Sequence, residues 1–206
     1  MNGLPLNLEN AKAWHEGRKT QHRELIEIQP VITGAGCWYP HHNDDNPKHY
    51  VSESHLMKGL AADFSCYKVG EKVFIQEMWC DFKAMMYPQE PHDFRRIVFE
   101  ASHSDLYPDA EWRPPETLPE DYSRSTAIIT DIRVERIQSI TEEDAKAEGI
   151  YYDGDYWRSV IHPVKGMLKC WPTAKMALEN MLDSIYPDSW ERNDYVWVYE
   201  LKKEGE

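Results

Sequence analysis

The chain has 206 residues, 41% hydrophobic and 12% aromatic, so it is long and apolar enough to fold around a core and does not resemble a disordered tail. Its 36 acidic and 23 basic residues give a formal net charge of −13, which argues against a broad nucleic-acid-coating surface. The sequence shows neither a secretory signal nor an apolar run near the roughly 18 residues that cross a bilayer, and no two cysteines form a C-x-x-C pair. We therefore expect a cytoplasmic protein with reduced thiols and no membrane contact.

The first part of the chain predicts a capped helix, a strand and a long insertion. Asn7 is placed to cap a helix that Gly17 ends. Residues 23–30 then have the composition of a strand closed by a proline. Residues 31–66 are polar and weakly periodic, which predicts a long loop with one short helix near 52–62.

The middle of the chain predicts two strands and a surface loop. Residues 72–79 alternate as a strand, and residues 95–101 form a second, shorter one. The first of these strands carries four side chains on one face: Val73, Ile75, Glu77 and Trp79. Residues 102–122 are acidic and rich in proline, so we expect them at the surface.

The last part of the chain has the clearest patterns. Residues 125–138 predict a long strand with Ile128, Ile132 and Val134 on one face. A capping-box pattern at Thr141 and Asp144 predicts a short helix that ends at Gly149, and an aromatic loop follows over 150–172. Residues 173–186 predict an amphipathic helix, and residues 194–202 a closing strand. The apolar face of that helix is formed by Leu178, Met181, Leu182 and Ile185. This order indicates an α+β domain built on a small mixed barrel.

Four blocks in a set order resemble the ASCH domain family, a branch of the PUA-like β-barrels. They are GRKTQHRE, VGEKVFIQEMW, the run SRSTAIITDIRVERIQSITEEDAKAEGI, and the closing strand YVWVYELK. The resemblance is closest to the longer ASCH-like proteins of phages and prophages. It implies a single domain over 1–206, with a small mixed PUA-like (ASCH) β-barrel, short connector helices and insertions at about 31–66, 80–122 and 150–172.

The resemblance also implies a cleft and an association with RNA or modified nucleosides. Some small members of the family are amidohydrolases that remove an acyl group from N4-acetylcytidine, and another is a ribonuclease. The active-site Lys and Glu of the amidohydrolases fall on Lys19 and Glu148 of this chain, and their Thr falls on His22. This departure removes the hydroxyl that can act as an acyl nucleophile, although Thr20 lies nearby in the sequence.

The chemistry of these residues can be weighed without the family. Lys19 beside Glu148 can transfer protons if burial lowers the pKa of the lysine, and His22 can act as a general base near neutral pH. The plain alternative is an exposed ion pair. Glu77 is expected on a buried face, where an unpaired carboxylate is costly, so we expect Arg23 or Arg124 to pair with it. The alternative is that this pair is only a structural ion pair at the end of a strand. We expect five residues to bind substrate: Thr20, Arg23, Glu77, Trp79 and Arg124.

No metal or cofactor is expected, because the cysteine and histidine spacing fits no compact zinc site. The residues considered for such a site are Cys37, His41, His42, His49, His55 and Cys66. Four loop aromatics either stack on nucleic-acid bases or pin their loops to the core: Trp38, Tyr39, Trp157 and Trp171.

Two classes of function follow. The first is a pocket for nucleic acid or a modified nucleoside that acts as a hydrolase of the amidohydrolase or ribonuclease type. In that case residues 31–66 are expected to pack over or beside the opening. The second is a non-catalytic phage accessory protein whose acidic surface binds a host protein. A single-stranded RNA binder without chemistry is a further alternative.

Overall fold

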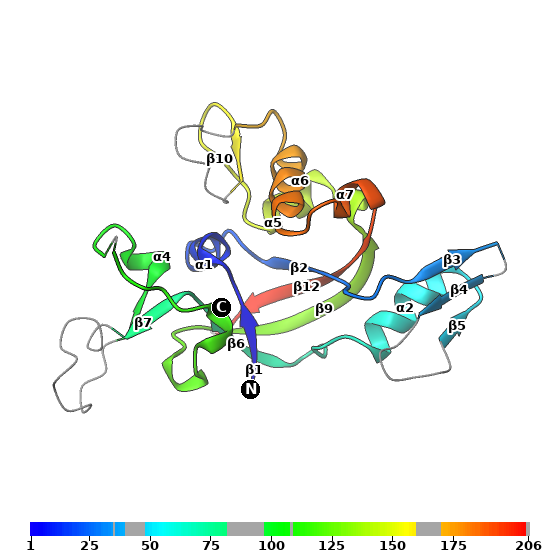
Figure 1. Ribbon diagram of the computed structural model, residues 1–206, viewed down its shortest axis with the longest axis horizontal. Helices are drawn as coiled ribbons and strands as arrows, with labels where there is room; N and C mark the ends of the chain where they lie inside the picture. The colour runs from blue at the N-terminus through cyan, green and yellow to red at the C-terminus, as the bar shows by residue number, and fades with distance from the viewer. Residues whose placement is uncertain (35, 40–47, 82–96, 108, 160–169, 205–206) are drawn as a thin grey trace. The chain divides into compact units, whose positions relative to one another are not determined.

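The computed structural model describes residues 1–34, 36–39, 48–81, 97–107, 109–159 and 170–204 (Figure 1). Over these residues the protein is α+β, with short helices set between strands of several sheets. The described chain groups into two compact units. The first comprises Met1–Gly17, Lys72–Ile128 and Lys202–Glu206, and the second comprises Arg18–Glu71 and Ile129–Leu201. Among the described residues, every helix is too short or too polar to span a membrane.

The first unit is built around a parallel strand pair. Strand β1 pairs with β6 from Asn2 opposite Val73 onward, and β6 pairs antiparallel with the start of β9. Strands β7 and β8 form a separate antiparallel pair. The elements that lie in this unit are β1 (Asn2–Pro5), α1 (Leu8–His15), β6 (Lys72–Gln76), β7 (Trp79–Asp81), β8 (Ile97–Phe99), α4 (Glu100–His103), η1 (Pro115–Thr117), η2 (Glu120–Tyr122) and the first residues of β9 (Thr126–Arg136).

Strand β6 is buried on both faces, so the predicted alternation of a buried and an open face is wrong there. Phe74 and Gln76 are buried like their neighbours, and the Gln76 amide donates to the carbonyls of Glu116 and Leu118 at 3.1 Å each. The acidic segment 102–122 is therefore more than a surface loop, because it satisfies this buried amide. Its Leu118 also packs in a small core with Trp79.

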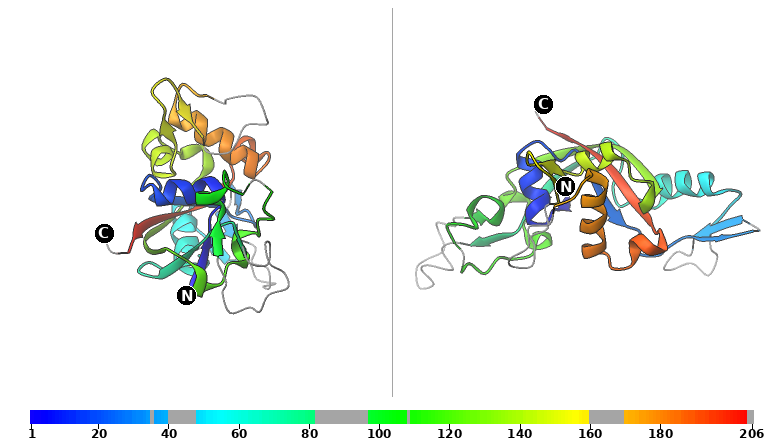
Figure 2. Two further views of the ribbon diagram at one scale, coloured as in Figure 1. Left: turned by 90° about the vertical axis from the view of Figure 1, so that its left-hand side faces the viewer. Right: turned by 90° about the horizontal axis from the view of Figure 1, so that it is seen from above.

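The second unit is built around the antiparallel pair β2 and β12, in which His22 lies opposite Tyr199. Strand β12 lies between β2 and β9, as Figures 1 and 2 show from different sides. No pairing among the described strands closes a barrel. The elements that lie wholly or mainly in this unit are β2 (Gln21–Leu25), β3 (Val31–Thr33), β4 (Gly36–Tyr39), β5 (Lys48–Tyr50), α2 (Glu53–Asp63), the rest of β9, η3 (Ile137–Ser139), α5 (Glu142–Ala147), β10 (Tyr151–Tyr152), β11 (Trp157–Arg158), α6 (Ala174–Ile185), α7 (Ser189–Arg192) and β12 (Tyr195–Lys203).

The helix signals of the sequence are confirmed at their N-termini. The Asn7 side chain accepts from the Asn10 amide at 2.9 Å. Thr141 and Asp144 form both bonds of a capping box at the start of α5. Gly149, with φ of +103°, follows this helix in the left-handed conformation that favours glycine.

The core of the second unit joins α5, α6 and β12. Leu178, Met181 and Leu182 are buried as predicted, but Ile185 is 37% exposed, because it is the last residue of α6. The buried members of this core are Ile137, Ile140, Ala145, Ile150, Ala174, Ala177, Leu178, Met181, Leu182, Val196 and Val198. This packing holds the C-terminal end of α5 against the sheet.

The strand predicted over 23–30 ends early, at Leu25. The side chain of Gln29 takes the place of further strand pairing. Its amide nitrogen donates to the backbone carbonyls of Ile26 and Tyr195, and its carbonyl oxygen accepts from the backbone amide of Tyr195 at 2.6 Å. A side chain that satisfies these backbone groups lets the chain leave the sheet.

The predicted loop over 31–66 is instead a three-stranded sheet, β3-β4-β5, followed by α2. The short helix is confirmed and is capped by Ser52. Glu53 of this helix accepts from Arg136 at 3.0 Å and from the Tyr195 hydroxyl. This anchor lies near the start of β12, about 20 Å along the strand from Leu201 at a rise of about 3.3 Å per residue.

Strand β9 does not keep one buried face. Ala127 and Ile129 are buried near its start, whereas Val134 is buried near its end, so the predicted shared face of Ile128, Ile132 and Val134 is wrong. Side chains alternate along a strand, so Ala127 and Ile129 lie on one face of the pleat and Val134 lies on the other, and the buried face changes between Ile129 and Val134.

Candidate functional site

The basic segment after α1 is fixed in the second unit by its backbone. The Thr20 amide donates to the carbonyl of Ala147 at 2.8 Å, and the Thr20 carbonyl accepts from the Leu201 amide at 2.8 Å. These bonds join the end of α5 to the C-terminal half of β12. Thr20 itself is exposed, whereas its neighbour Lys19 is buried.

Lys19 and Glu148 form a buried ion pair. The Lys19 ammonium lies 2.7 Å from Glu148 Oε2, and the two side chains are 0% and 2% exposed. Glu148 is the C-terminal cap residue of α5, so the ending of that helix places its carboxylate against the basic segment. The expected proximity of the two residues is confirmed, and the alternative of an exposed pair is wrong.

Arg23 is the second cation of this site. Its guanidinium donates to Glu148 Oε1 at 3.0 Å, so each carboxylate oxygen of Glu148 faces a different cation. Arg23 also lies 3.3 Å from Glu135 and 3.4 Å from Asp144. Its expected alternative role, as the partner of Glu77, is therefore not realised.

A layer of polar residues surrounds Arg23, in which the charged members are partly exposed and Gln21 is buried. Arg133 contacts Glu135 at 2.5 Å and Asp144 at 3.1 Å and also pairs with Glu200. The Gln21 amide donates to Glu200 at 2.7 Å and to Asp144 at 3.2 Å. Sequence reasoning missed this layer, because its members come from β2, β9, α5 and β12 and share no local motif.

Burial sets the electrostatics of the pair. Loss of solvent lowers the pKa of Lys19, and the nearby positive charge of Arg23 lowers it further, against the opposing effect of Glu148. Burial by itself would raise the pKa of Glu148, but the charges of Lys19 and Arg23 outweigh it and the pKa is lowered. The lowered pKa of Glu148 and the lowered pKa of Lys19 are consistent with each other. Glu148 stays ionised because it faces two cations, whereas Lys19 faces one carboxylate that it shares with Arg23.

His22 points away from this network. Side chains alternate along β2, so Gln21 and Arg23 share one face and His22 and Glu24 share the other. His22 Nε2 lies 3.3 Å from Glu24, and its buried Nδ1 has no hydrogen-bond partner among the described residues. The position that matches the family's Thr is thus on the opposite face of β2 from Arg23.

Glu77, Arg124 and Trp79 lie in the first unit, not in the unit that holds Lys19. Arg124 donates to both oxygens of Glu77, at 2.9 and 2.7 Å, and His15 lies 2.8 Å from the same carboxylate. Burial raises the pKa of Glu77, but the bonds from Arg124 and His15 outweigh it and lower the pKa overall. The geometry is that of a structural ion pair.

The indole of Trp79 is also engaged. Its Nε1 donates to Thr117 Oγ1 at 3.0 Å, and Arg113 stacks on the ring at 4.7 Å. Both contacts attach the 113–117 segment to β7, which is a structural role.

Of the zinc candidates, His41 and His42 lie outside the described residues. In the part of the chain that the structure describes, no three His, Cys, Asp or Glu side chains are grouped as a metal site. The loop aromatics are mostly held by the fold: Tyr39 stacks edge-on with Phe64 at 5.0 Å, and Trp157 and Trp171 pack partly buried against the core of the second unit.

When the chain is compared with known proteins, no family model, curated protein or solved structure matches it. The resemblance to the ASCH family therefore rests on the four sequence blocks alone.

Proposed function

We propose that the chain is an ASCH-like hydrolase, on a PUA-like barrel, that removes an acyl group from a modified nucleoside. Lys19 and Glu148 are its proton-transfer pair. The observation that carries this proposal is the 2.7 Å contact of the two groups in a fully buried position, where burial lowers the pKa of the lysine. A proton-transfer group works best when its pKa is moved toward the working pH, and burial moves the pKa of Lys19 in that direction.

The proposed reaction is amide hydrolysis. Glu148 takes a proton from water as the water oxygen attacks the acyl carbon, and the Lys19 ammonium gives a proton to the leaving amine as the C–N bond breaks. The products are a carboxylic acid and the free amino nucleoside, and transfer of the proton from Glu148 to Lys19 restores the pair. Arg23 holds the second oxygen of Glu148 during these steps.

The proposal requires the substrate to reach side chains that are almost fully buried, so the contact between Lys19 and Glu148 opens during turnover. Thr20, the residue after Lys19, is exposed and is therefore the part of the surface nearest to Lys19 along the chain. If the pair never opens, it serves only to attach α5 to the segment before β2.

The test measures acetate release from N4-acetylcytidine by NMR, with wild type, Glu148→Gln and a matched control, Glu53→Gln. Glu53 is also a carboxylate of the second unit with an arginine partner, but it lies far along β12 from the pair. We expect Glu148→Gln to lower the rate by about 10²- to 10⁴-fold and Glu53→Gln to leave it unchanged.

Circular dichroism at the assay temperature verifies that each variant is folded. Lack of acetate release by the wild type would remove the amidohydrolase proposal, and so would an unchanged rate in Glu148→Gln. Cleavage of single-stranded RNA in the same preparations would instead indicate a ribonuclease. A gain of acetate release in His22→Thr would show that position 22 limits this chemistry.

A further inference from the structure

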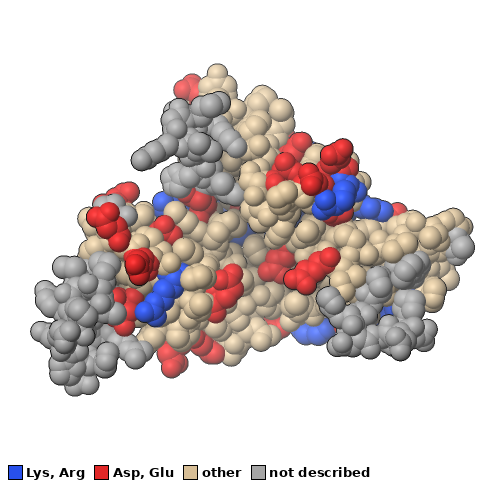
Figure 3. All heavy atoms as spheres, viewed as in Figure 1, with Lys and Arg blue, Asp and Glu red and all other residues tan. Residues whose placement is uncertain are grey.

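A cavity of about 300 Å³ lies beside α6 and α7 in the second unit, away from the residues used above. Its lining, as far as the described residues form it, includes four carboxylates, from Glu179, Asp183, Asp188 and Glu191, and no lysine or arginine. Acidic side chains also gather over α6 and α7 on the face shown in Figure 3. A site of this charge disfavours phosphate and nucleic acid, so it is distinct in chemistry from a nucleotide pocket.

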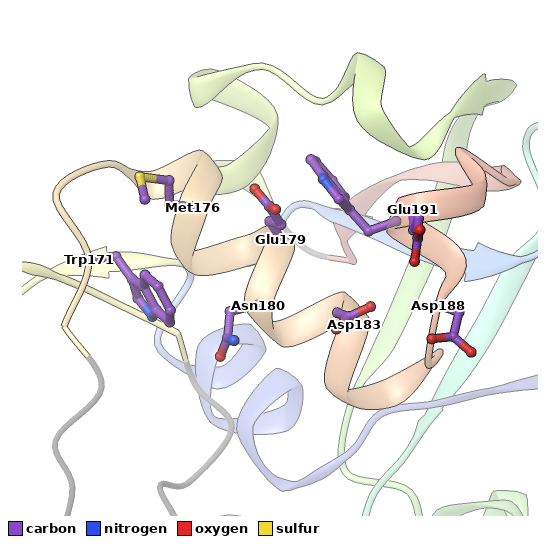
Figure 4. A pocket seen from close by; sticks show the side chains of 8 residues that line it. Trp171, Met176, Glu179, Asn180, Asp183, Asp188 and Glu191 are labelled. Carbon is purple, nitrogen blue, oxygen red and sulfur yellow. The ribbon is translucent and has the colours of Figure 1, made fainter.

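The cavity has a charged end and an apolar end. Figure 4 shows the carboxylates of Asp183, Asp188 and Glu191 grouped at one end, with Trp171 and Met176 at the other. Met176 is 41% exposed, whereas Leu178, Met181 and Leu182 of the same helix are buried.

The two indoles of the cavity are held by the protein core. Trp171 and Trp190 both pack against the core of the second unit, and the Trp190 carbonyl accepts from the Gln138 amide at 2.8 Å. The Trp171 indole nitrogen is buried and has no hydrogen-bond partner among the described residues. A buried N–H donor without an acceptor is uncommon.

Local geometry keeps the acidic groups together. Glu179 and Asp183 are four residues apart on α6 and therefore share a face. Asp188 adopts a left-handed conformation, with φ of +63°, which turns the chain so that α7 returns toward that face. The Lys175 ammonium lies 5.9 Å from the centre of the Trp190 ring and donates to the Gln138 carbonyl.

We propose that this cavity binds a small organic cation, with its ammonium group among the carboxylates and its apolar body against Trp171 and Met176. The indole rings attract an ammonium through their negative faces, and the carboxylates supply its counter-charge. The proposal stands independently of the hydrolase, because it uses none of that site's residues.

The test uses the indole N–H signals of the ¹⁵N-labelled full chain, which has 8 tryptophans. Trp171→Phe and Trp190→Phe assign the two relevant signals. Three probes share one six-carbon body and differ in charge: hexylammonium, hexanol and hexanoate. We expect hexylammonium to shift the Trp171 and Trp190 signals saturably, with Kd of about 1 mM, and hexanoate to leave them in place.

Variants separate a specific site from the general acidity of the chain. The double variant Asp183→Asn/Glu191→Gln is expected to raise the Kd of hexylammonium about fivefold or more. The matched control, Asp131→Asn/Glu143→Gln, removes two exposed carboxylates of the same unit outside the cavity and is expected to change Kd by less than about twofold.

Equal shifts with hexanol or hexanoate would overturn the proposal, as would equal weakening in the two double variants or no indole shift at all. An acetylated pentalysine peptide distinguishes the sources of the ammonium group. Tighter binding of the peptide than of hexylammonium identifies a lysine side chain as the natural ligand, and weaker binding identifies a free amine. Either result keeps the ammonium assignment.

Discussion

The Arg23 guanidinium donates to Glu148 at 3.0 Å, on the carboxylate oxygen that the Lys19 ammonium leaves free. Glu148 therefore pairs with two buried cations at once.

We expect Glu148→Gln to destabilise the protein by about 3–5 kcal/mol, because removing the carboxylate leaves the buried Lys19 ammonium uncompensated and takes one of three carboxylates from Arg23. If Lys19 and Glu148 were the exposed ion pair considered from the sequence, changing either of them would leave the thermal melt almost unchanged. That premise is wrong, because both are buried. Urea unfolding, with a check that the m-value stays constant, measures the loss.

Glu135→Gln is the control for this variant, because Glu135 contacts the same Arg23 but is 24% exposed. Its loss is expected to be about 1 kcal/mol or less. Similar losses in the two variants would contradict the central position of Glu148.

A second prediction concerns Lys19→Met, which replaces the buried ammonium by an apolar chain of similar length. Because the pKa of Lys19 is lowered from 10.5 on folding, the unfolded chain binds the proton more tightly, and the stability of the wild type rises as pH approaches 10.5. The variant lacks this contribution. The stability of the wild type relative to Lys19→Met is therefore expected to increase between neutral pH and about pH 10.

Urea unfolding of both proteins across this range gives the difference directly, and other alkaline-titrating groups cancel in it. A difference that stays flat or falls with pH would mean that the ammonium is not penalised by burial.

Asp144 provides a third prediction, at acid pH. Burial opposes ionisation of this carboxyl, but hydrogen bonds from the Thr141 amide and hydroxyl and the charge of Arg23 outweigh it and lower the pKa from 3.8 to about 2. A lowered pKa stabilises the folded state above the unfolded value and ceases to do so as pH falls through the folded one. The advantage of the wild type over Asp144→Asn should therefore be full above about pH 4 and fade toward about pH 2.

Thermal melts at several pH values measure this advantage, and Asp131→Asn is a control for removal of an exposed carboxylate from the same unit. An advantage of Asp144 that persists unchanged at pH 2 would contradict the prediction.

The fourth prediction tests the packing of α2 on β5. A Cβ on Gly59 would lie 2.2 Å from Tyr50 Cε1 and 2.8 Å from Cζ, which no ring can accommodate without moving. Alanine usually favours a helix over glycine by about 1 kcal/mol. We nevertheless expect Gly59→Ala to destabilise this substructure by about 1–3 kcal/mol, because overpacking outweighs propensity.

Hydrogen exchange of the α2 amides measures this loss. Tyr50→Ala removes the ring that the new Cβ meets. Gly59→Ala should therefore destabilise the Tyr50→Ala variant less than it destabilises the wild type. Gly34→Ala, where a Cβ meets nothing within 4 Å, is the neutral control.

The sequence by itself determined those features that depend on residues close together in the chain. The caps at Asn7 and Thr141, the glycine after α5 and the apolar face of α6 each follow from the spacing of a few neighbours, and the structure places them as expected except for the exposed Ile185. The proximity of Lys19 and Glu148 was also anticipated, through the order of four blocks that resemble a known family.

Tertiary structure decided the features that depend on distant residues. Either Arg23 or Arg124 was compatible with Glu77 on charge alone, and only the division of the chain into two units gives Glu77 to Arg124 and Glu148 to Arg23. A carboxylate's partner is set by which strands and helices converge on it, and residue types alone do not encode this.

The acidic cavity shows the same limit. In sequence, Glu179 and Asp183 are the ordinary polar face of an amphipathic helix. They become one wall of a cavity only because Asp188, in its left-handed conformation, returns α7 to that face and because Trp171 packs beside α6 from a separate segment. Local periodicity specifies which side of a helix is polar, but what lies across from that side is determined by the packing of the whole unit.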